Sequence, residues 1–332
     1  MRRLLLVSCL ALLSISRALA QAAAPPPEGE IRDLAPIVVS GVQPGPGMWK
    51  VSKGDHAMWV LGTISPVPKR MEWEARDVEA VIARAQEFIE APGVRVDAKA
   101  GFFQRLALVP KALGARKNPD GLTLEQVVPA DMYARWLPLK RKYMGNDAGI
   151  EQWRPMFAAM ELYQEAIDDS GLKQGGLVAP VVDRAVKKYK VNRTSPTLMI
   201  MIEDPKQALL EFRESQLDDL DCFGKTLQRL ETDLDTMRDR ANAWATGDLD
   251  TLRALPYSDQ NEACLRAAAR AGVLRKRAGD IEAQVESRWM EAAEKALANN
   301  AVTFAVLPMR ELLKPDGYIA KLQSKGYVVE AP

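Results

Sequence analysis

The sequence predicts an α/β or α+β protein in which a mixed β-sheet is flanked by many helices. Short apolar runs typical of buried strands recur at residues 57–61, 198–202 and 303–307. Longer stretches whose apolar residues lie three or four positions apart, as in helices, separate these runs. The sequence has no internal repeat, so we expect residues 47–332 to form a single domain.

Residues 1–20 predict a signal peptide that is cleaved on export. Two arginines precede an apolar run at residues 4–15, and Ala-Leu-Ala at residues 18–20 is the small-residue pattern that signal peptidase recognises. The run is too short to span a bilayer as a stable helix, and no later segment is long and apolar enough to do so. We therefore expect a periplasmic or secreted protein. A lipid anchor is the alternative, because residues 6–9, Leu-Val-Ser-Cys, form a lipoprotein-like box.

The charge balance excludes partners that are held by bulk charge. The chain has 45 basic and 44 acidic residues. Loss of the three arginines in the predicted leader would leave a net charge of about −2, which argues against nucleic acid or an anionic membrane bound in that way.

Two cysteines, Cys222 and Cys264, remain after the predicted cleavage. In an oxidising compartment a pair of cysteines more often forms a disulfide than stays free. This bond would stabilise the fold by about 3–4 kcal/mol in the chain-entropy model. Two buried thiols are the alternative.

The domain is expected to begin with a β-hairpin. Residues 21–46 are rich in Ala, Pro and Gly and predict a flexible linker. Residues 49–51 and 57–61 then flank the turn residues 53–55, Lys-Gly-Asp, as in a hairpin. A helix over residues 71–88 and a short strand at 88–90 follow.

The middle of the chain is expected to be mainly helical between residues 100 and 190. Thr123 and Asp131 are candidate N-caps, and apolar spacing predicts a helix over 153–167. The unbroken apolar run at 198–202 predicts a central strand buried on both faces. Asp204-Pro205 then predicts the start of a helix.

Two long helices are expected at residues 217–244 and 274–297 and are predicted to pack against each other as a pair. Gly247 is expected to end the first of them, and Asp248 to cap a short helix. A buried strand at 303–307, a helix after the turn at 315–317, and a short strand at 327–329 complete the chain.

Several catalytic templates are missing from the sequence. It has no phosphate-binding glycine loop and no Gly-x-Ser-x-Gly elbow. His56 is the only histidine, and its place beside Gly54-Asp55 favours an exposed turn residue over a catalytic base. Because zinc usually takes His or Cys ligands, we do not expect a conventional zinc site.

Polar residues follow four predicted strands: Ser65, Glu90, Glu203 and Glu311. If these strands are parallel neighbours, their side chains would face one crevice at the carboxyl end of the sheet. Such an oxygen-rich cluster suits Mg²⁺, Ca²⁺ or Mn²⁺, or a carboxylate general base. The alternative, which we favour, is that each glutamate caps a helix or pairs with an arginine such as Arg288 or Arg310.

Short motifs across residues 48–329 resemble the TraB/GumN family in their order and spacing. They are Trp49-Lys50-Val51, Leu61-Gly62-Thr63-Ile64, Ile202-Glu203, Trp244-x-x-Gly247-Asp248, Arg288 with Met290, Phe304-Ala305-Val306, Leu312-Leu313, Pro315-Asp316-Gly317 and Gly326-Tyr327-x-Val329. The resemblance implies an α/β fold shared with the Tiki proteases, animal relatives that cut peptides with a divalent metal.

Those relatives are expected to hold their metal with two Gly-x-x-His motifs and a glutamate. Here the first motif reads Gly-Thr-Ile-Ser at 62–65, and the second reads Pro-Met-Arg-Glu at 308–311. Glu90 matches an acidic position after the second strand. A serine hydroxyl is a poor metal ligand compared with imidazole, and Arg310 adds a positive charge at the second motif. The resemblance therefore predicts a member without metallopeptidase activity, a pseudoenzyme.

Three functional hypotheses follow. The first is a non-catalytic envelope protein that needs no cofactor. It would bind a peptide, a glycan or a protein partner in the cleft that corresponds to the active site of the related proteases. The second is a hydrolase with an all-oxygen site on Glu90, Glu203 and Glu311, which would bind Mg²⁺, Mn²⁺ or Ca²⁺. The third is a structural envelope protein that works through the predicted helix pair.

Overall fold

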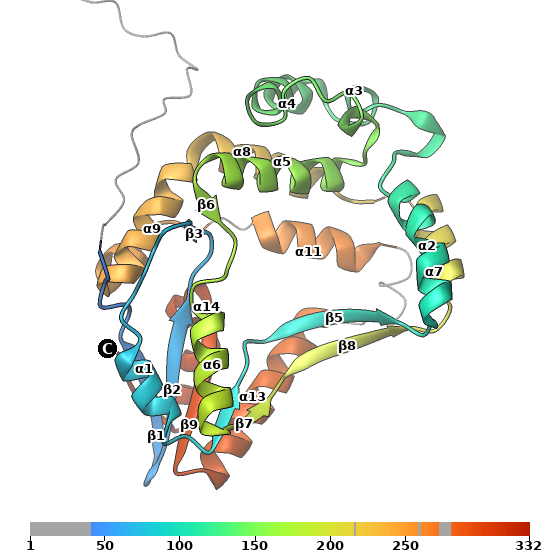
Figure 1. Ribbon diagram of the computed structural model, residues 1–332. Helices are drawn as coiled ribbons and strands as arrows, with labels where there is room; N and C mark the ends of the chain where they lie inside the picture. Colours follow the sequence, from blue (N-terminus) through green and yellow to red (C-terminus); the bar gives the residue numbers. More distant parts are fainter. Residues whose placement is uncertain (1–40, 216, 258–259, 272–279) are drawn as a thin grey trace, which may run out of the picture. The chain divides into compact units, whose positions relative to one another are not determined.

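A computed structural model describes residues 41–332 except 216, 258–259 and 272–279 (Figure 1). The predicted signal peptide, most of the predicted linker and the start of the second long helix therefore lie outside the described residues. The central element is a six-stranded mixed sheet with the order β10-β1-β2-β9-β4-β7. Its strands are β1 Met48–Lys53, β2 His56–Thr63, β4 Glu87–Ile89, β7 Asn192–Thr194, β9 Val302–Pro308 and β10 Val328–Glu330.

The predicted hairpin and the predicted buried strand form the middle of this sheet. β1 and β2 pair antiparallel around Gly54-Asp55, with Lys53 opposite His56. β9 lies between β2 and β4 and is parallel to both. Phe304, Ala305 and Leu307 are completely buried. The carboxyl ends of β2, β9, β4 and β7 consequently share one edge.

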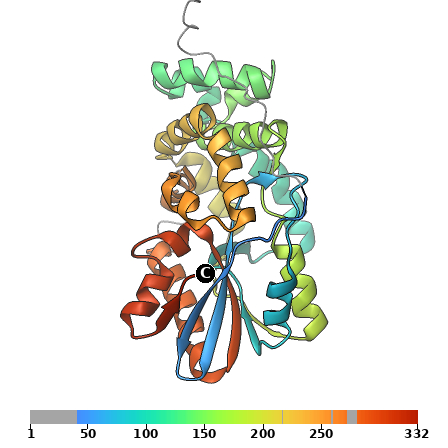
Figure 2. The same cartoon turned by 90° about the vertical axis from the view of Figure 1, so that its left-hand side faces the viewer.

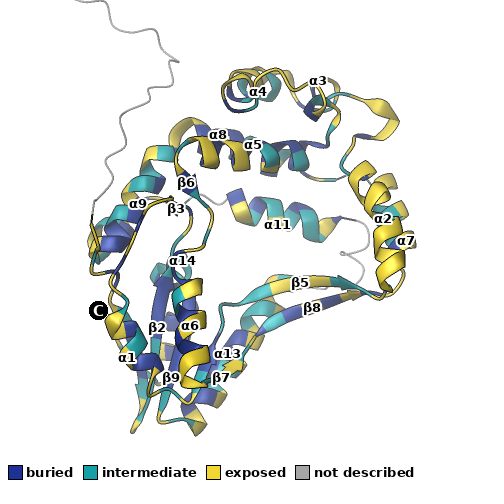
Figure 3. Ribbon diagram, viewed as in Figure 1, coloured by how far each residue is buried: buried dark blue, intermediate teal, exposed yellow. Residues whose placement is uncertain are grey.

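Helices cover both faces of the sheet (Figure 2). α1 (Arg76–Ile82) and α6 (Ala179–Tyr189) pack together on one face. α13 (Ile281–Asn299) and α15 (Tyr318–Ser324) cover the other face, and the short α14 (Met309–Leu313) follows β9 directly. Residues from the sheet and from all of these helices form one hydrophobic core. Figure 3 shows the adjacent strands β2 and β9 as mostly buried.

A second hydrophobic core lies among helices. It is built around Trp136 and Phe223, whose ring centres are 5.6 Å apart. The helices concerned are α3 Leu124–Val127, α4 Ala130–Tyr143, α5 Pro155–Asp169, α8 Leu220–Thr232 and α9 Leu234–Thr246. Two further helices, α10 (Leu249–Ala254) and α11 (Gln260–Arg270), follow α9 along the chain.

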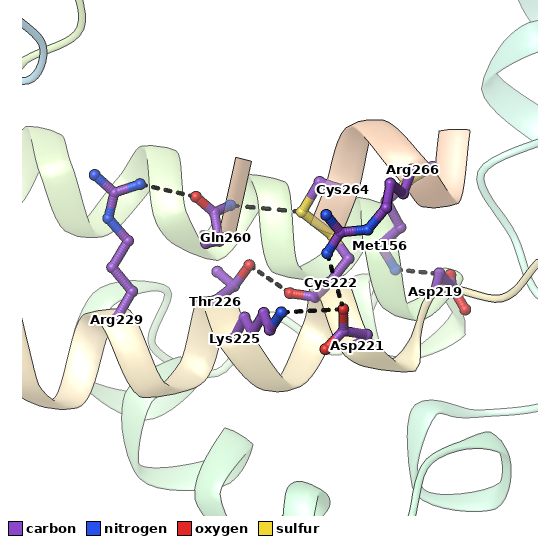
Figure 4. The surroundings of a disulfide bond; sticks show 10 residues. All are labelled: Met156, Asp219, Asp221, Cys222, Lys225, Thr226, Arg229, Gln260, Cys264 and Arg266. Atoms are coloured by element: carbon purple, nitrogen blue, oxygen red, sulfur yellow. Dashed lines mark hydrogen bonds and ion pairs between the residues drawn. A yellow bond between two sulfur atoms is a disulfide. The ribbon is translucent and has the colours of Figure 1, made fainter. Parts of the chain in front are cut away.

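The predicted disulfide joins α8 to α11 (Figure 4). Cys222 and Cys264 are 42 positions apart in sequence. In the chain-entropy model a closed loop of this length stabilises the fold by about 3–4 kcal/mol. Asp221 of α8 also forms an ion pair with Arg266 of α11 at 3.5 Å, so a disulfide and an ion pair both join the two helices.

The strand at 197–202 lies outside the main sheet, contrary to the prediction. β8 (Thr197–Ile202) pairs in parallel with β5 (Gly93–Ala98) as a separate two-stranded ribbon. Leu198 and Ile200 pack against α13, whereas Met199 and Met201 are exposed. The prediction was wrong because an unbroken apolar run shows hydrophobicity but cannot show that both faces are covered. Two helices, α2 (Phe102–Gly114) and α7 (Pro205–Glu214), follow these strands, and β3 (Val67–Pro68) pairs with β6 (Leu172–Lys173).

The predicted pair of long helices is also wrong. The first helix is divided at Asp233 into α8 and α9. α8 packs mainly on α5 and α11, and α13 packs on β2, β4, β8 and β9 of the two sheets. Apolar spacing correctly showed that each helix buries one face, but it could not show which element covers that face.

Local boundaries agree with the sequence in several places. Asp204 caps α7 by accepting a hydrogen bond from the Gln207 backbone N–H at 2.9 Å. Asp248 caps α10 through the Thr251 N–H at 3.0 Å, and Gly247 ends α9 with a φ of 74°. Thr123 precedes α3 as expected.

Three predicted boundaries were misplaced. α4 begins after Pro129, so Asp131 lies in its first turn and is not its cap. The helix predicted over 71–88 is formed only as α1. The predicted linker reaches the folded domain earlier than expected, because Gln43 bridges to Trp73 and the Gly45 N–H donates to the Ala245 carbonyl at 2.8 Å.

Candidate binding site

A cavity of about 600 Å³ opens at the carboxyl ends of β2, β4 and β9. Open α/β sheets usually bind ligands at this edge, and the volume suits a small organic molecule or a short peptide. The strand ends contribute Thr63, Ser65, Phe88, Glu90, Val306 and Pro308 to its lining. Helices α8 and α9 and the segment after α10 contribute Arg229, Arg240 and Tyr257.

Two buried tryptophans hold the strand ends in place. The indole N–H of Trp244 on α9 donates to the Gly62 carbonyl at 2.8 Å, and that of Trp289 on α13 donates to the Glu90 carbonyl at 3.2 Å. A Cβ at Gly62 would lie 2.4 Å from the terminal methyl group of Met309, so a larger residue at position 62 would force that side chain to move. These contacts fix the ends of β2 and β4 on either side of β9.

Ser65, which the resemblance places at the first motif's histidine position, lines the cavity. Its hydroxyl accepts a hydrogen bond from the Gly175 backbone N–H at 3.1 Å. The side chain is exposed and joins the loop after β2 to the loop that precedes α6. Ser65 thus has a local structural role as well as a place at the cavity.

Glu90 also lines the cavity, where it is paired with an arginine. Arg193 donates to Glu90 at 2.6 Å and to Asp183 at 2.5 Å, and its guanidinium lies over the Phe88 ring at 5.2 Å. The hydrogen bond to Asp183, with a further contribution from Glu90, raises the pKa of Arg193 although burial opposes the shift. The guanidinium therefore remains charged, and Glu90 is held in an ion pair.

Glu203 and Glu311 do not join Ser65 and Glu90, so the conditional hypothesis of one shared crevice is wrong. The favoured alternative agrees with the structure for Glu311, which pairs with Arg310, and for Glu90, which pairs with Arg193, whereas Glu203 pairs with a lysine. Glu203 follows β8, outside the main sheet, and its carboxylate lies 3.1 Å from Lys99 Nζ. Glu311 lies on α14, 3.2 Å from Arg310 Nε, and lines a smaller neighbouring hollow. Glu203 is absent because β8 is not a strand of the main sheet, and only strands of the same sheet share a carboxyl edge. Glu311 is absent because it lies within α14, beyond the end of β9 at Pro308.

Of the remaining predicted site residues, one lines the cavity and two lie away from it. Arg310 lines the cavity and the neighbouring hollow, whereas Arg288 is exposed on α13. His56 begins β2, at the opposite end of the strand from the cavity. Its Nδ1 lies 2.7 Å from the Leu297 carbonyl and its ring is largely covered, so it is not the exposed turn residue we expected.

The described residues contain no group of three or more His, Cys, Asp or Glu placed to hold a metal ion. The acidic residue that lines the cavity beside Glu90 is Asp183, and both carboxylates bind Arg193. The charges at this part of the cavity are therefore arranged as a salt-bridge network.

Two buried arginines on α8 and α9 are residues of the candidate site that the sequence analysis did not identify. Arg229 is 7% exposed and Arg240 is 4% exposed, and both line the cavity. Arg240 donates to Asp233 at 2.8 Å and also to the Pro256 carbonyl. Arg229 donates to Gln260 at 2.9 Å (Figure 4), and its Nε lies 3.5 Å from the same Asp233 oxygen.

This part of the cavity therefore has more positive than negative charge. Asp233, at the break between α8 and α9, is the one described carboxylate within ion-pair distance of the two arginines. Burial lowers the pKa of Arg229, and Arg240 and Arg310 act in the same direction, while Tyr163 and Asp233 oppose them. A buried guanidinium of this kind is stabilised by a further anion.

Tyr257 adds an unused donor to the same region. Its hydroxyl is buried and has no hydrogen-bond partner among the described residues, and Arg240 lies over its ring at 5.3 Å. A signal for this site does exist in the sequence, because Arg229, Asp233 and Arg240 are four and seven positions apart. That spacing places the three charges on one side of the helix that apolar spacing predicts over residues 217–244.

We predict that Asp233→Asn destabilises the fold by about 3–5 kcal/mol, because it leaves two buried guanidiniums without their shared carboxylate. Urea denaturation measures the change. The control is Asp235→Asn, which removes a more exposed ion pair with Arg238 and should cost less than about 1 kcal/mol. Equal costs for the two variants would show that the shared carboxylate is not important.

Comparison with known proteins assigns the family. A model of the TraB/PrgY/gumN family matches residues 47–331, which include the whole sheet and its covering helices. A search of curated proteins and a search of solved structures each found no match. The motifs that carried the resemblance all lie within the matched region. The chain therefore belongs to the TraB/PrgY/gumN family.

Proposed function

We propose that this family member is an exported, non-catalytic protein whose cavity binds a small ligand with an acidic group. The observation that carries the proposal is the pair of buried arginines, Arg229 and Arg240, which share the single carboxylate of Asp233. A carboxylate or phosphate placed between them and Tyr257 would supply the missing negative charge and accept the unused hydrogen bonds.

The motif positions support the absence of metallopeptidase chemistry. A hydroxyl, Ser65, stands in place of the first imidazole, and Glu311 in place of the second is 3.2 Å from Arg310. Glu90 is bonded to Arg193. A cation at this position would have to displace two arginines from their carboxylates, and it would retain no imidazole ligand.

The other charges around the cavity favour a ligand that also carries an amine. Near the end of β4, Glu90 and Asp183 share Arg193, which leaves one negative charge in excess. The arginines of α8 and α9 leave one positive charge in excess. Apolar residues such as Val306 and Met309 also line the cavity. A short peptide with free ends has this combination of groups, so of a peptide, a glycan and a protein partner we favour the peptide.

We predict that trialanine binds and that its C-terminal amide binds at least about tenfold more weakly, because a charge-assisted hydrogen bond is lost. Isothermal titration calorimetry measures both affinities. Arg310 also lines the cavity, and its positive charge acts on Arg229. Arg310→Gln should therefore weaken binding of trialanine but leave binding of its amide unchanged. The matched control, Arg76→Gln, removes an exposed arginine that pairs with Glu74 away from the cavity and should change neither affinity.

Binding of trialanine and its amide with equal affinity would contradict the acidic-ligand proposal. Glucuronate and inorganic phosphate serve as further probes in the same experiment. Binding of glucuronate without trialanine would identify a glycan-type ligand, and the absence of binding by every probe would count against the cavity as a small-molecule site.

Export is proposed from the sequence of residues 1–20 and from the disulfide, which is typical of oxidising compartments. We predict that protein recovered from the periplasm begins at Gln21 and has both remaining cysteines oxidised. Intact-mass measurement before and after reduction tests both points, since reduction should add two hydrogens. A mass that includes residues 1–20, or a lipid on Cys9, would contradict the proposed processing.

The alternative function is a hydrolase with an all-oxygen metal site. We predict that purified protein equilibrated with Mn²⁺, Mg²⁺ or Ca²⁺ retains no stoichiometric ion, because Glu203 and Glu311 do not line the cavity with Glu90. Elemental analysis after gel filtration measures this. A stoichiometric ion that disappears in Glu90→Ala, Glu203→Ala and Glu311→Ala but persists in the control Glu74→Ala, together with peptide cleavage, would establish the hydrolase instead.

A further inference from the structure

Helix α2 (Phe102–Gly114) exposes an apolar face. None of its residues is buried (Figure 3). Its large apolar side chains have these exposed fractions: Phe102 74%, Phe103 82%, Leu106 59%, Val109 49% and Leu113 52%. Residues 102, 106, 109 and 113 are four, three and four positions apart, so they form one stripe along the helix. A soluble protein rarely leaves such a surface uncovered without a binding function.

Helix α2 is nevertheless held against the end of strand β5, which precedes it. Arg105 donates to the carbonyls of Ala98 and Ala100 and lies 3.0 Å from the Asp97 carboxylate. α2 also contacts α7, and Leu108 is partly buried. The exposed stripe therefore belongs to a helix that is held in place by other contacts.

The charge around α2 identifies the kind of partner. Residues 98–119 contain five basic residues and no acidic residue, although the whole chain is almost neutral. Lys99 and Arg105 pair with carboxylates. Lys111, Arg116 and Lys117 have no carboxylate partner among the described residues. Lys117 donates to the neutral Gln152 side chain and Arg116 lies over the Trp153 ring, so none of the three positive charges is neutralised by a carboxylate in the part of the chain that the structure describes. An apolar helical face on a segment of net positive charge matches an anionic lipid surface.

We propose that α2 lies in the surface of an anionic lipid bilayer, with Phe102 and Phe103 inserted at the boundary between headgroups and acyl chains. The local basic charge attracts the anionic headgroups even though the chain as a whole has almost no net charge. A second copy of the chain could also cover the stripe, but a two-fold contact would bring the two positively charged segments, residues 98–119 of each copy, together. Charge therefore favours lipid. The proposal is independent of the cavity and its ligand.

Vesicle sedimentation tests this proposal on the purified protein. Vesicles of equimolar phosphatidylglycerol and phosphatidylcholine should bind it, and vesicles of phosphatidylcholine alone should bind it at least about tenfold more weakly. The double variant Phe102→Ala/Phe103→Ala should lower binding to the anionic vesicles by at least about tenfold. The control is Met160→Ala, because Met160 is an exposed apolar residue on α5. All variants share one N-terminus, so any contribution of residues 1–40 is the same in each.

A second pair of variants tests whether binding to anionic vesicles depends on the basic residues near α2. Lys111→Gln should weaken binding to the anionic vesicles by about fivefold, since each basic residue near the surface contributes separately. Lys295→Gln, an exposed lysine on α13, should leave binding unchanged. Equal binding to both vesicle types, or equal effects of the two lysine variants, would overturn the proposal.

A fluorescent label tests whether α2 itself enters the lipid. Because Cys222 and Cys264 are bonded to each other, Leu106→Cys supplies a free thiol for an environment-sensitive dye. Its emission should shift to the blue with anionic vesicles, whereas a dye at Val328→Cys should not respond. Absence of a shift at 106 would overturn the proposal. So would a dimer, detected by light scattering, that dissociates in the phenylalanine double variant and does not bind vesicles.

Discussion

The parallel pairing of β9 with β2 on one side and β4 on the other is the constraint on which the site depends. β9 is almost completely buried, so its neighbours cannot change without exposing the core. This pairing brings Ser65 and Glu90, which are distant from Pro308 in sequence, to one edge of the sheet. The hydrogen bonds from Trp244 and Trp289 then fix those strand ends against helices from two different parts of the chain.

Much of this framework could be predicted from sequence, because it depends on local signals. The hairpin, the β9 strand, the caps at Asp204 and Asp248 and the disulfide pairing all follow from short patterns. The positions of β8 and of the long helices could not be predicted in this way. Apolar periodicity shows that a face is buried, but the element that buries it is decided by tertiary packing.

The same limit explains what was found and missed at the site. Ser65 and Glu90 follow strands of one sheet, so the rule about strand ends places them at the cavity. Glu203 fails because β8 pairs elsewhere. Arg229 and Arg240 were missed because arginine on a helix is usually solvated. Arg229 is instead covered by Tyr163 of α5 and Gln260 of α11, and Arg240 contacts Pro256 and Tyr257 in the segment after α10.

Retention of the fold without the motif histidines has a physical explanation. The strand ends are held by indole–carbonyl hydrogen bonds and by the close contact at Gly62, and none of these contacts involves positions 65 or 311. Substitution at those positions therefore leaves these strand-end contacts in place, and at position 65 it changes a group that lines the cavity. With Arg193 bonded to Glu90, and with Arg229 and Arg240 nearby, the cavity that remains is organised by guanidinium groups. This arrangement of guanidinium groups is the physical basis for proposing an acidic ligand at the cavity.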